Sequence, residues 1–576
     1  MKTKNRYLPL FGLACLSLIA APAYSDRDTA PGQLVELQLL GFNDYHGHVK
    51  TDAVGFGETR GGGEYLAAKL KELREGKKNS LTVAAGDLIG GTPAFSGLFH
   101  DEPSVESLNA MELDVSSVGN HEFDEGVLEL LRMQNGGCHP EDGCYFPEEP
   151  YAGADFKWLA ANVVSEYDGL TTPLPPYWIK NIQGVKVGFI GMTLEATDTL
   201  VAAAGIQGWD FRDEAETANN LVPLLTARGV NAIVVLLHEG GSQTPPPGDV
   251  DACVGISGPI VAINQALDPE IDVMITGHTH LPYNCRLPDA AGNDRIVTSA
   301  YSYGRVVTEV NLVLDKQTRD IRRDLSTSVN HEVVRDDLLP DEAITAVIDK
   351  WQPKYDELAS QAVGTITEDV NRGGDPTGSD RGVESAAGNL VADAQLWATT
   401  NLGAEIAFMN PGGVRTDLVY ASSTEGEGDG VVTFGEAFSF QPFNNTLFTI
   451  QMTGAQIVAV LEEQCQPATA SRPFLHLGVS EGFTYDLAKA IDVGTDTCTS
   501  ITVSNVQLNG VPLDMDATYG VTVNNFLADG GDNFTTFATV TGTRLDGGID
   551  LDALTAYLEE KSPVSAPDTD RVNELN

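Results

Sequence analysis

The chain has 576 residues, with 35 basic and 82 acidic side chains and a formal net charge of −47. This length exceeds what one hydrophobic core supports, so we expect roughly two to four domains. A surface this acidic repels polyanions, which argues against nucleic-acid polymers and anionic membranes as partners. The acidic residues are dispersed and do not follow the spacing of calcium-binding loops, so solubility in a saline environment is the simplest interpretation of the charge.

The first 25 residues have the pattern of a secretory signal peptide. An apolar stretch at 7–21 follows three basic residues, and small residues at 21–25 would form the cleavage site. The stretch is too short for a stable membrane anchor. A lipoprotein with Cys15 as the lipidated residue is the alternative, although the residues around Cys15 match such a signal poorly. With no C-terminal lipid-anchor signal either, we expect a periplasmic or secreted protein without a membrane anchor.

Removing this segment would leave six of the seven cysteines, an even number that suits an oxidising compartment. Their spacing groups them into three local pairs: Cys138 with Cys144, Cys253 with Cys285, and Cys465 with Cys498. None has the CxxC spacing of a structural zinc site, so disulfides are the stronger interpretation, although sequence cannot prove the connectivity.

Five apolar runs in the first half of the chain each end in polar side chains that can bind metal ions. The runs are rich in Val, Ile and Leu and too short for buried helices, so they predict strands buried on both faces at 34–42, 80–85, 114–118, 231–237 and 271–276. Ligands bind beyond the carboxyl ends of strands in open α/β sheets, so these polar segments should converge on one site. Carboxylate, imidazole and amide groups together suit Zn, Mn, Fe or Co.

A second α/β region is predicted in the rest of the chain. Residues 341–359 have the periodicity of one long amphipathic helix, which Pro353 could kink. Beyond it we predict a helix at 388–398, strands at 406–409, 447–452 and 519–524, and a surface loop at 422–430. The expected division is a signal peptide at 1–25, a first domain at 26–335, a linker helix at 336–361 and a second domain at 362–576.

The polar segments are Asn43-Asp44-Tyr45-His46-Gly47-His48, Gly86-Asp87, Gly119-Asn120-His121-Glu122-Phe123-Asp124, His238-Glu239 and Gly277-His278-Thr279-His280. Their order and spacing closely resemble the calcineurin-like metallophosphoesterases. Residues 410–415 and 525–534 resemble the substrate-binding signatures of the 5′-nucleotidase branch, which includes bacterial periplasmic 5′-nucleotidases and UDP-sugar hydrolases. The resemblance covers nearly all of the chain beyond residue 30. It implies an α/β fold with a four-layer α/β/β/α metallophosphoesterase domain, a linker helix and a C-terminal α/β substrate-binding domain.

The resemblance also implies two divalent metal ions, with Zn, Mn, Co and Mg as candidates and Asp87 as the shared ligand. The remaining ligands would be Asp44, His46 and His280 at one ion, and Asn120, His238 and His278 at the other. An isolated buried histidine is more often structural than a ligand. Six of the ten histidines, however, fall in these segments, which favours the metal interpretation. We expect His48, Glu122 and Glu239 to lie outside the ligand set.

His121 and Asp124 are expected to form a catalytic dyad in which the carboxylate orients the imidazole. The imidazolium would stabilise charge on the phosphate and on its leaving oxygen. The alternative is that His121 is a further metal ligand. The dyad is favoured because the adjacent Asn120 already points to a metal and neighbouring side chains seldom converge on one ion.

Six residues of the second domain match substrate-binding positions of the family. Phe443 and Phe526 would clamp a nucleobase, a contact that contributes ~1–3 kcal/mol per base, although either alone could be a core residue. Arg381 and Arg415 would contact phosphate, because a guanidinium binds two oxygens at once. Asp532 would bind ribose hydroxyls, and Asn410 the base or the sugar.

We therefore expect a secreted or periplasmic dinuclear-metal phosphohydrolase that removes the 5′-phosphate of nucleoside monophosphates, a step of nucleotide catabolism. Alternatives on the same scaffold are UDP-sugar or NAD pyrophosphate hydrolysis, and 2′,3′-cyclic phosphodiesterase with 3′-nucleotidase activity. A non-catalytic nucleotide-binding or adhesive surface protein is disfavoured, because a degenerate relative should lose metal ligands first and the full set is present here.

Overall fold

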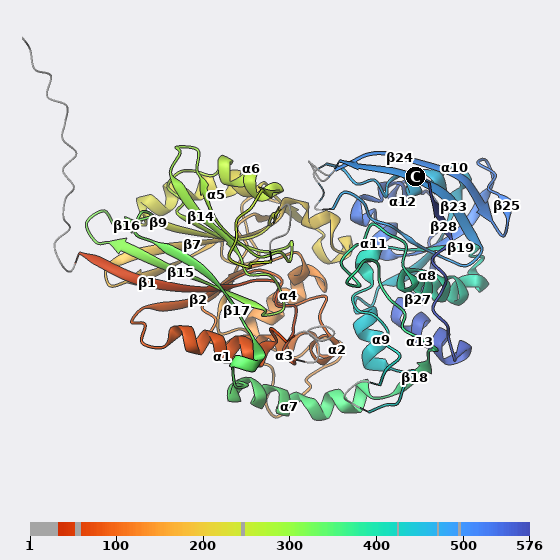
Figure 1. Cartoon of the computed structure of the whole chain (residues 1–576), viewed down its shortest axis with the longest axis horizontal. Helices are drawn as coiled ribbons and strands as arrows, with labels where there is room; N and C mark the ends of the chain where they lie inside the picture. Colours follow the sequence, from red (N-terminus) through yellow and green to blue (C-terminus); the bar gives the residue numbers. More distant parts are fainter. Residues whose placement is uncertain are drawn as a thin grey trace, which may run out of the picture.

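The structure is a computed structural model that describes residues 33–51, 59–243, 248–422, 426–468, 470, 472–492 and 497–575. Two α/β lobes lie side by side, and the long helix α7 (Glu342–Ala359) runs between them along one edge (Figure 1). Pro353 lies inside this helix. The expected signal peptide at 1–25 falls outside the described residues. Within the described ranges no helix has both the length and the apolar composition needed to cross a membrane.

The N-terminal lobe is built on two β-sheets. The strand order of the first is β16-β15-β1-β2-β3-β4, with β17 beside β15, and that of the second is β13-β14-β12-β9-β7-β6. The first sheet consists of β1 (Leu34–Phe42), β2 (Ser80–Ala85), β3 (Val115–Ser117), β4 (Lys157–Leu159), β15 (Val306–Asp315), β16 (Asp320–Ile321) and β17 (Thr327–Glu332). The second consists of β6 (Tyr177–Ile182), β7 (Val185–Thr193), β9 (Ala232–His238), β12 (Val273–Thr276), β13 (Tyr283–Pro288) and β14 (Asp294–Ser299).

The pleat divides each buried strand between two cores. Val35, Leu37 and Leu39 of β1 pack between the sheets, whereas Leu40 and Phe42 pack against the helices that cover the first sheet. In β9 the even-numbered residues 232–236 face the first sheet, and the odd-numbered residues 233–237 face the helices on the other side. These helices are α1 (Gly63–Arg74), α3 (Glu102–Ala110) and α4 (Gly126–Asn135) on the first sheet, and α5 (Glu214–Ala227) and α6 (Pro259–Ala266) on the second. The lobe therefore has the expected four α/β/β/α layers.

All five predicted strands of this lobe are present, with ends that agree with the prediction or differ by one or two residues. They do not share one sheet. β1, β2 and β3 are parallel neighbours in the first sheet, and β9 and β12 are parallel neighbours in the second. The carboxyl ends of both groups meet at one edge of the sandwich, where the predicted ligand segments begin.

The C-terminal lobe contains a five-stranded and a four-stranded sheet. The first is β22 (Gly478–Val479), β19 (Ile406–Met409), β26 (Thr518–Asn524), β21 (Thr446–Thr453) and β27 (Leu545–Ile549); the second is β25 (Val511–Pro512), β24 (Thr497–Leu508), β23 (Phe483–Asp492) and β28 (Val572–Glu574). The helices beside them include α8 (Ala386–Thr399), α10 (Gly454–Glu462) and α13 (Asp550–Lys561). The predicted helix and three strands of this half are confirmed as α8, β19, β21 and β26.

Two short helices join the lobes beside α7. Ala94, in α2 (Ala94–Gly97), donates its backbone N–H to Ser439 Oγ (3.1 Å) in α9 (Phe434–Phe440). A Cβ at Gly97 would lie 2.7 Å from the ring of Phe438, so glycine permits this close approach. Phe95 packs on Tyr355 of α7 with ring centroids 5.4 Å apart. These contacts fix α9, and with it the loop at 441–445, against the N-terminal lobe.

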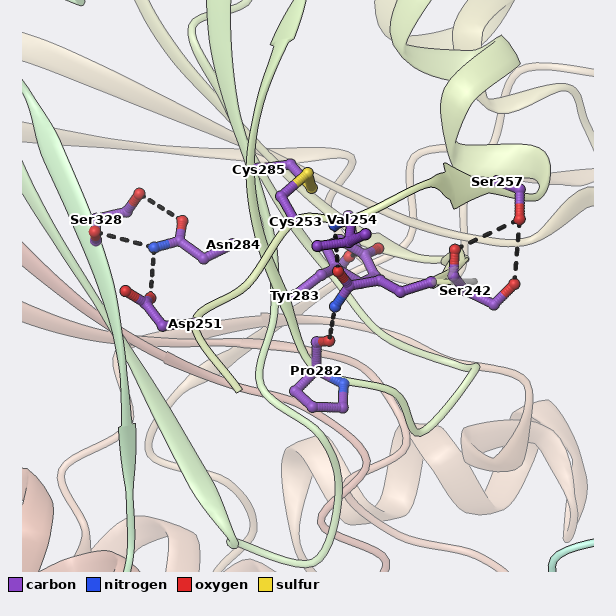
Figure 2. Close-up of a disulfide and its surroundings, with 12 residues drawn as sticks. Ser242, Asp251, Cys253, Val254, Ser257, Pro282, Tyr283, Asn284, Cys285 and Ser328 are labelled. Atoms are coloured by element: carbon purple, nitrogen blue, oxygen red, sulfur yellow. Dashed lines mark hydrogen bonds between the residues drawn. A yellow bond between two sulfur atoms is a disulfide. The ribbon is translucent and has the colours of Figure 1, made fainter. Parts of the chain in front are cut away.

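All three cysteine pairs that the spacing suggests form disulfides. Cys253–Cys285 ties the segment around residue 253 to β13 (Figure 2). The neighbouring Asn284 donates to Asp251 Oδ1 (2.7 Å) and to the carbonyl of Ser328 (2.9 Å), so the same segment is also fixed to β17. Each disulfide reduces the conformational freedom of the unfolded chain and thereby stabilises the fold.

Candidate functional site

Seven predicted ligand side chains gather at the carboxyl ends of β1, β2, β3, β9 and β12. Asp44, His46 and His280 offer ligand atoms within 4.8 Å of one another, and so do Asp87, His238 and His278. Asn120 joins the second group, since its Oδ1 lies 3.1 Å from His278 Nδ1. The structure thus brings together all seven residues from segments more than two hundred positions apart.

Asp87 lies between the two groups. Its Oδ2 is 2.9 Å from His238 Nε2 and 3.5 Å from His46 Nε2. His46 Nε2 is in turn 3.2 Å from His280 Nε2, and His280 Nε2 is 3.1 Å from Asp44 Oδ1. A carboxylate between two sets of ligands has the position that a residue shared by two metal ions requires.

The donor set fits divalent metal ions. His46 Nδ1 donates to the carbonyl of Gly90 (2.8 Å), and His238 Nδ1 donates to the carbonyl of Ala85 (2.7 Å). Because each Nδ1 donates to a carbonyl, each Nε2 is directed at the Asp87 carboxylate, where the two groups can share a cation, either a proton or a metal ion. His238 Nε2 is buried and lies 2.9 Å from Asp87 Oδ2. Such an arrangement is unfavourable without a cation between the two atoms, and it is how metal-binding histidines are usually oriented.

The charges of the cluster favour a cation at the same place. Burial opposes ionisation of His238, but Asp87 raises the pKa of this imidazole to about 10. Burial likewise opposes the charge on Asp87, yet His238 and the other histidines hold its pKa well below the usual range. Burial lowers the pKa of His46, His278 and His280, which keeps these imidazoles neutral and available as ligands.

The backbone of the ligand loops is unusual. Five predicted ligands lie in the left-handed region, with φ between 45° and 69°: Asp44, His46, Asp87, His278 and His280. A Cβ at Gly119 would lie 2.2 Å from Asp87 Oδ1, and one at Gly277 would lie 2.9 Å from Asp44 Oδ2. The glycines of these segments therefore let the carboxylates approach the backbone closely. Strained conformations of this kind concentrate at functional sites, where the surrounding structure maintains them.

The three polar residues expected outside the ligand set have other contacts. Glu122 is buried, and its carboxylate accepts the backbone N–H groups of Asp87 (2.9 Å), Leu88 (2.8 Å) and Gly119. His48 stacks on Tyr303 with ring centroids 3.9 Å apart. Glu239 is buried and accepts the N–H of Gly240 (2.7 Å). Glu122 thus orients the loop that carries Asp87.

His121 and Asp124 are hydrogen-bonded, with Nδ1 and Oδ2 2.7 Å apart. The His121 backbone N–H also donates to Asp87 Oδ1 (2.9 Å), which fixes the pair beside the ligands. Burial opposes charge on His121, but Asp124 and Asp87 raise its pKa. Atoms of His46, Asp87 and His121 also lie within 4.8 Å of one another, so the geometry fits either a dyad or a further ligand.

Two residues of the C-terminal lobe reach this centre. The Arg415 guanidinium lies against Gly91, where a Cβ would meet Nη2 at 3.1 Å. It also lies over the ring of Phe443, 5.8 Å from the centroid. The Phe443 ring is nearly parallel to the His121 imidazole, with centroids 6.0 Å apart and planes inclined by 16°. The guanidinium of Arg415 and the ring of Phe443, both from the C-terminal lobe, thus lie next to the predicted ligands of the N-terminal lobe.

The other four predicted substrate-binding residues are placed around the ends of β19 and β26. Asn410 donates to Asp532 Oδ2 (3.5 Å) and accepts from Asn524 (3.0 Å). Phe526 is half-buried in α11 (Asn525–Ala528), with its ring against Gly531. The Arg381 guanidinium lies beside Gly412, where a Cβ would meet Nη1 at 3.2 Å.

Arg472 is a residue of this region that the sequence did not single out. The segment that follows it is fixed on both sides: His476 N donates to the carbonyl of Arg381 (2.8 Å), and Gln466 N donates to the carbonyl of Pro473 (3.0 Å). Gln466 Nε2 also donates to the carbonyl of Asp532 (3.0 Å). Arg472 therefore borders both Arg381 and the Asp532 loop. A lone arginine in a stretch of Pro, Ala and Ser carries no motif that could have revealed it.

The arginines form a positive cluster. Burial lowers the pKa of Arg381, and the charges of Arg472 and Arg415 lower it further. Among the residues that the structure describes, neither Arg381 nor Arg472 has a hydrogen-bond or ion-pair partner from its side chain. Asp532 is the nearby carboxylate whose charge acts on both groups, but it makes no ion pair with either. Guanidinium groups held together in this way fit an anionic ligand such as phosphate.

Comparison with known proteins supports a phosphoesterase. Residues 37–282 match the family described as calcineurin-like phosphoesterase, and residues 362–539 match the 5′-nucleotidase C-terminal domain. The chain is 32% identical to the endonuclease YhcR of Bacillus subtilis, over 95% of this chain and 41% of that protein. It is 34% identical to the cell wall protein Lmo0130 of Listeria monocytogenes, over 90% of this chain and 66% of that protein. It thus spans less than two thirds of either relative.

Among solved structures, the chain is similar to a 5′-nucleotidase precursor from Thermus thermophilus. The identity is 26% and the TM-score 0.73, and the match covers 94% of this chain and 100% of that one. Both lobes therefore have counterparts in one known fold.

Replacing Asp87 by Asn should lower the metal content of the purified protein and abolish hydrolysis of phosphate esters. The amide removes the negative charge that both ligand groups face, at nearly unchanged volume. Elemental analysis after equilibration with Zn²⁺ or Mn²⁺ measures the metal, and circular dichroism checks that the fold is retained. Full metal content and full activity in this variant would exclude the shared-ligand role.

Proposed function

Because this chain belongs to the 5′-nucleotidase family of calcineurin-like metallophosphoesterases, we propose that it removes the 5′-phosphate of nucleoside monophosphates. The observation that carries this proposal is the approach of Arg415 and Phe443 to His121 and the ligand cluster. A general phosphatase needs no aromatic face beside its reacting centre. A nucleotidase does, because the base must be held while the phosphate lies at the metals.

The metal ligands would be Asp44, His46, Asp87, Asn120, His238, His278 and His280. Two divalent ions held there would polarise the phosphate and lower the pKa of the attacking water. Arg415 would bind two phosphate oxygens with its planar fork. As water attacks phosphorus and the bond to O5′ breaks, His121, oriented by Asp124, would stabilise the charge on the leaving oxygen and supply its proton.

The C-terminal lobe would bind the nucleoside. Phe443 and Phe526 would stack on the base, Asp532 would accept hydrogen bonds from ribose hydroxyls, and Asn410, which already contacts Asp532, would orient that carboxylate or contact the sugar. The boundaries proposed are a metallophosphoesterase domain at 26–335, the linker at 336–361 and a substrate-binding domain at 362–576. As the connection between them, α7 would serve as the hinge for any motion of one domain against the other.

A second candidate substrate class is nucleotides with two phosphate groups, such as UDP-sugars or NAD. The specific observation in its favour is the pair Arg381 and Arg472, which offers cationic groups beyond Arg415 that make no hydrogen bond or ion pair with a carboxylate of the described residues. A second phosphate would supply the missing anion.

We propose a location outside the cytoplasm. Three disulfides persist in oxidising compartments, and one relative is a cell wall protein. A nucleotide is the expected partner, since the net charge of −47 opposes binding of nucleic-acid polymers even though another relative is named an endonuclease.

A substrate panel tests the proposed function. The protein is stripped of metal, reloaded separately with Zn²⁺, Mn²⁺, Co²⁺ or Mg²⁺, and assayed with AMP, UDP-glucose, NAD, 2′,3′-cyclic AMP and a single-stranded oligonucleotide. We expect AMP to be hydrolysed with the highest kcat/KM and the oligonucleotide to remain intact. Hydrolysis of none of these compounds with any metal would leave a non-catalytic binding protein as the better interpretation.

Replacing His121 by Ala should lower kcat on the order of 10²–10⁴-fold while the metal content stays unchanged, because the imidazole acts on the leaving oxygen. Turnover of AMP and elemental analysis on the same preparation measure the two quantities. Loss of a metal ion in this variant would instead identify His121 as a ligand.

Replacing Phe443 or Phe526 by Ala should weaken AMP hydrolysis by the ~1–3 kcal/mol that base stacking supplies, with little change for glycerol phosphate, which has no base. The comparison of kcat/KM for the two esters separates stacking from chemistry. Phe448→Ala is a matched control, since Phe448 is half-buried in β21 and has Arg544 over its ring. An equal loss on both esters would show that the rings only pack the core.

Replacing Arg472 by Ala should raise KM for UDP-glucose and NAD by roughly 10-fold or more and leave AMP nearly unaffected, because a charge-assisted hydrogen bond contributes about 1.5–3 kcal/mol. Steady-state kinetics measure the effect. Arg544→Ala, which breaks a pair with Asp529, is the control. An equal change with AMP would assign Arg472 to the first phosphate or to structure.

A further inference from the structure

A second cluster of histidines and carboxylates lies in the N-terminal lobe apart from the predicted ligands. His100, Glu125, Glu129 and His139 each offer one ligand atom, and these four atoms lie within 4.8 Å of one another. His100 follows α2, Glu125 and Glu129 lie one helical turn apart at the start of α4, and His139 is in the loop after that helix. None of them belongs to the groups around Asp87.

The two imidazoles are already in contact. Their rings stack with centroids 3.7 Å apart and planes inclined by 16°. His100 Nδ1 lies 2.6 Å from Glu125 Oε2, and its Nε2 lies 2.7 Å from Asp142 Oδ2. His139 Nδ1 accepts the backbone N–H of Asp142 (3.1 Å), so the neutral ring has a lone pair on this nitrogen.

The backbone that carries both histidines is held firmly. The disulfide Cys138–Cys144 closes the loop around His139, and His139 and Gly143 exchange two backbone hydrogen bonds of 3.0 Å. His100 has a positive φ of 48°, and so has the next residue, Asp101 (58°). The Asp101 carboxylate accepts from Gly90 N (2.9 Å) and Ser96 Oγ (2.7 Å), which stabilises this conformation. Side chains on so fixed a frame are preorganised for binding.

The cluster has an excess of negative charge. Arg132 pairs with Glu129 and Glu102, whereas the carboxylates of Glu125 and Asp142 face His100, and Asp142 also lies 3.6 Å from His139 Nδ1. Burial opposes a charge on His100, but the hydrogen bond that His100 donates to the Glu125 carboxylate raises its pKa to about 9. Burial and the neighbouring His100 lower the pKa of His139. The surroundings of His100 therefore favour a positive charge, whereas His139 is neutral and can give a lone pair to a metal ion.

We propose that His100, Glu125, Glu129 and His139 bind a divalent transition-metal ion, with Zn²⁺ the best match. Two imidazoles with two carboxylates suit zinc better than magnesium or calcium, which prefer oxygen ligands only. A tetrahedral site with bonds of ~2.0–2.1 Å has ligand atoms about 3.4 Å apart, so side-chain shifts on the order of 1 Å would close the site. The cation would replace the proton that His100 shares with Glu125 and take the His139 lone pair in place of the Asp142 N–H.

The role of this ion would be structural. Four protein ligands leave no open position for a substrate, as in structural zinc sites. The ion would join α4 to the disulfide loop, whose neighbours Tyr145 and Phe146 pack on Trp351 of α7 with centroids 5.7 Å and 4.8 Å apart. It would thereby stiffen the contact between the N-terminal lobe and the connecting helix. This inference does not depend on the substrate proposed above.

The test compares zinc content among variants of the whole chain. His139→Ala and His100→Gln are equilibrated in a zinc-buffered solution beside the unchanged protein. His331→Ala serves as control because His331 pairs with the carboxylate of Glu309, outside the cluster. We expect each of the two variants to hold one zinc ion fewer than the unchanged protein and the control to hold the same number. Hydrolysis of a phosphate ester should be retained, which shows that the lost ion is not at the Asp87 centre.

Equal zinc content in all four proteins would overturn the proposal. A second measurement covers the case in which a substitution disturbs folding. Crystals of the unchanged protein grown with zinc should show an anomalous-scattering peak among the four side chains at the zinc absorption edge. A peak at the Asp87 centre with none between His100 and His139 would also overturn it.

Discussion

Two imidazole Nε2 atoms directed at one buried carboxylate are the constraint on which the N-terminal lobe depends. Fixing the protons of His46 and His238 on Nδ1 leaves both Nε2 atoms directed at Asp87, at 3.5 Å and 2.9 Å. Buried groups in this arrangement are costly unless a cation lies among them. The left-handed ligand residues, the glycines beside the carboxylates and the bonds from backbone N–H groups to Glu122 all maintain this geometry.

The charge of the chain explains why the second lobe is needed at the same place. A protein with a net charge of −47 repels a phosphate ester at most of its surface. Arg415, Arg381 and Arg472 all come from the C-terminal lobe, and Arg415 reaches the Gly90–Gly91 loop that orients His46. The contacts of α2 and α7 with α9 hold that lobe in position. The packing of the two lobes thus determines where the electrostatic potential becomes positive.

Much of this organisation could be predicted from the sequence, and the failures have physical causes. Short Val-, Ile- and Leu-rich runs reveal strands because burial on both faces leaves no polar alternation. The same property hides which sheet a strand joins, so the division of β1–β3 from β9 and β12 was not predictable. Cysteines close in sequence paired as expected. The position of Arg472 is not predictable, because its neighbours, Arg381 and the Asp532 loop, are distant in sequence.

The two histidine clusters illustrate the same limit in another way. Around Asp87 each predicted ligand lies at or just after the end of a strand, so the fold imposes the recurring Gly-Asp, Gly-Asn and Gly-His segments by which the centre can be recognised. His100 and His139 are brought together by a helix start and a disulfide loop, which impose no fixed spacing. The two clusters therefore differ in what surrounds their histidines. The strand ends lie next to Arg415 and Phe443 of the other lobe, whereas His100 and His139 lie beside two carboxylates that would complete the four ligands of the proposed zinc site. The first arrangement suits catalysis, and the second suits stabilisation of the fold.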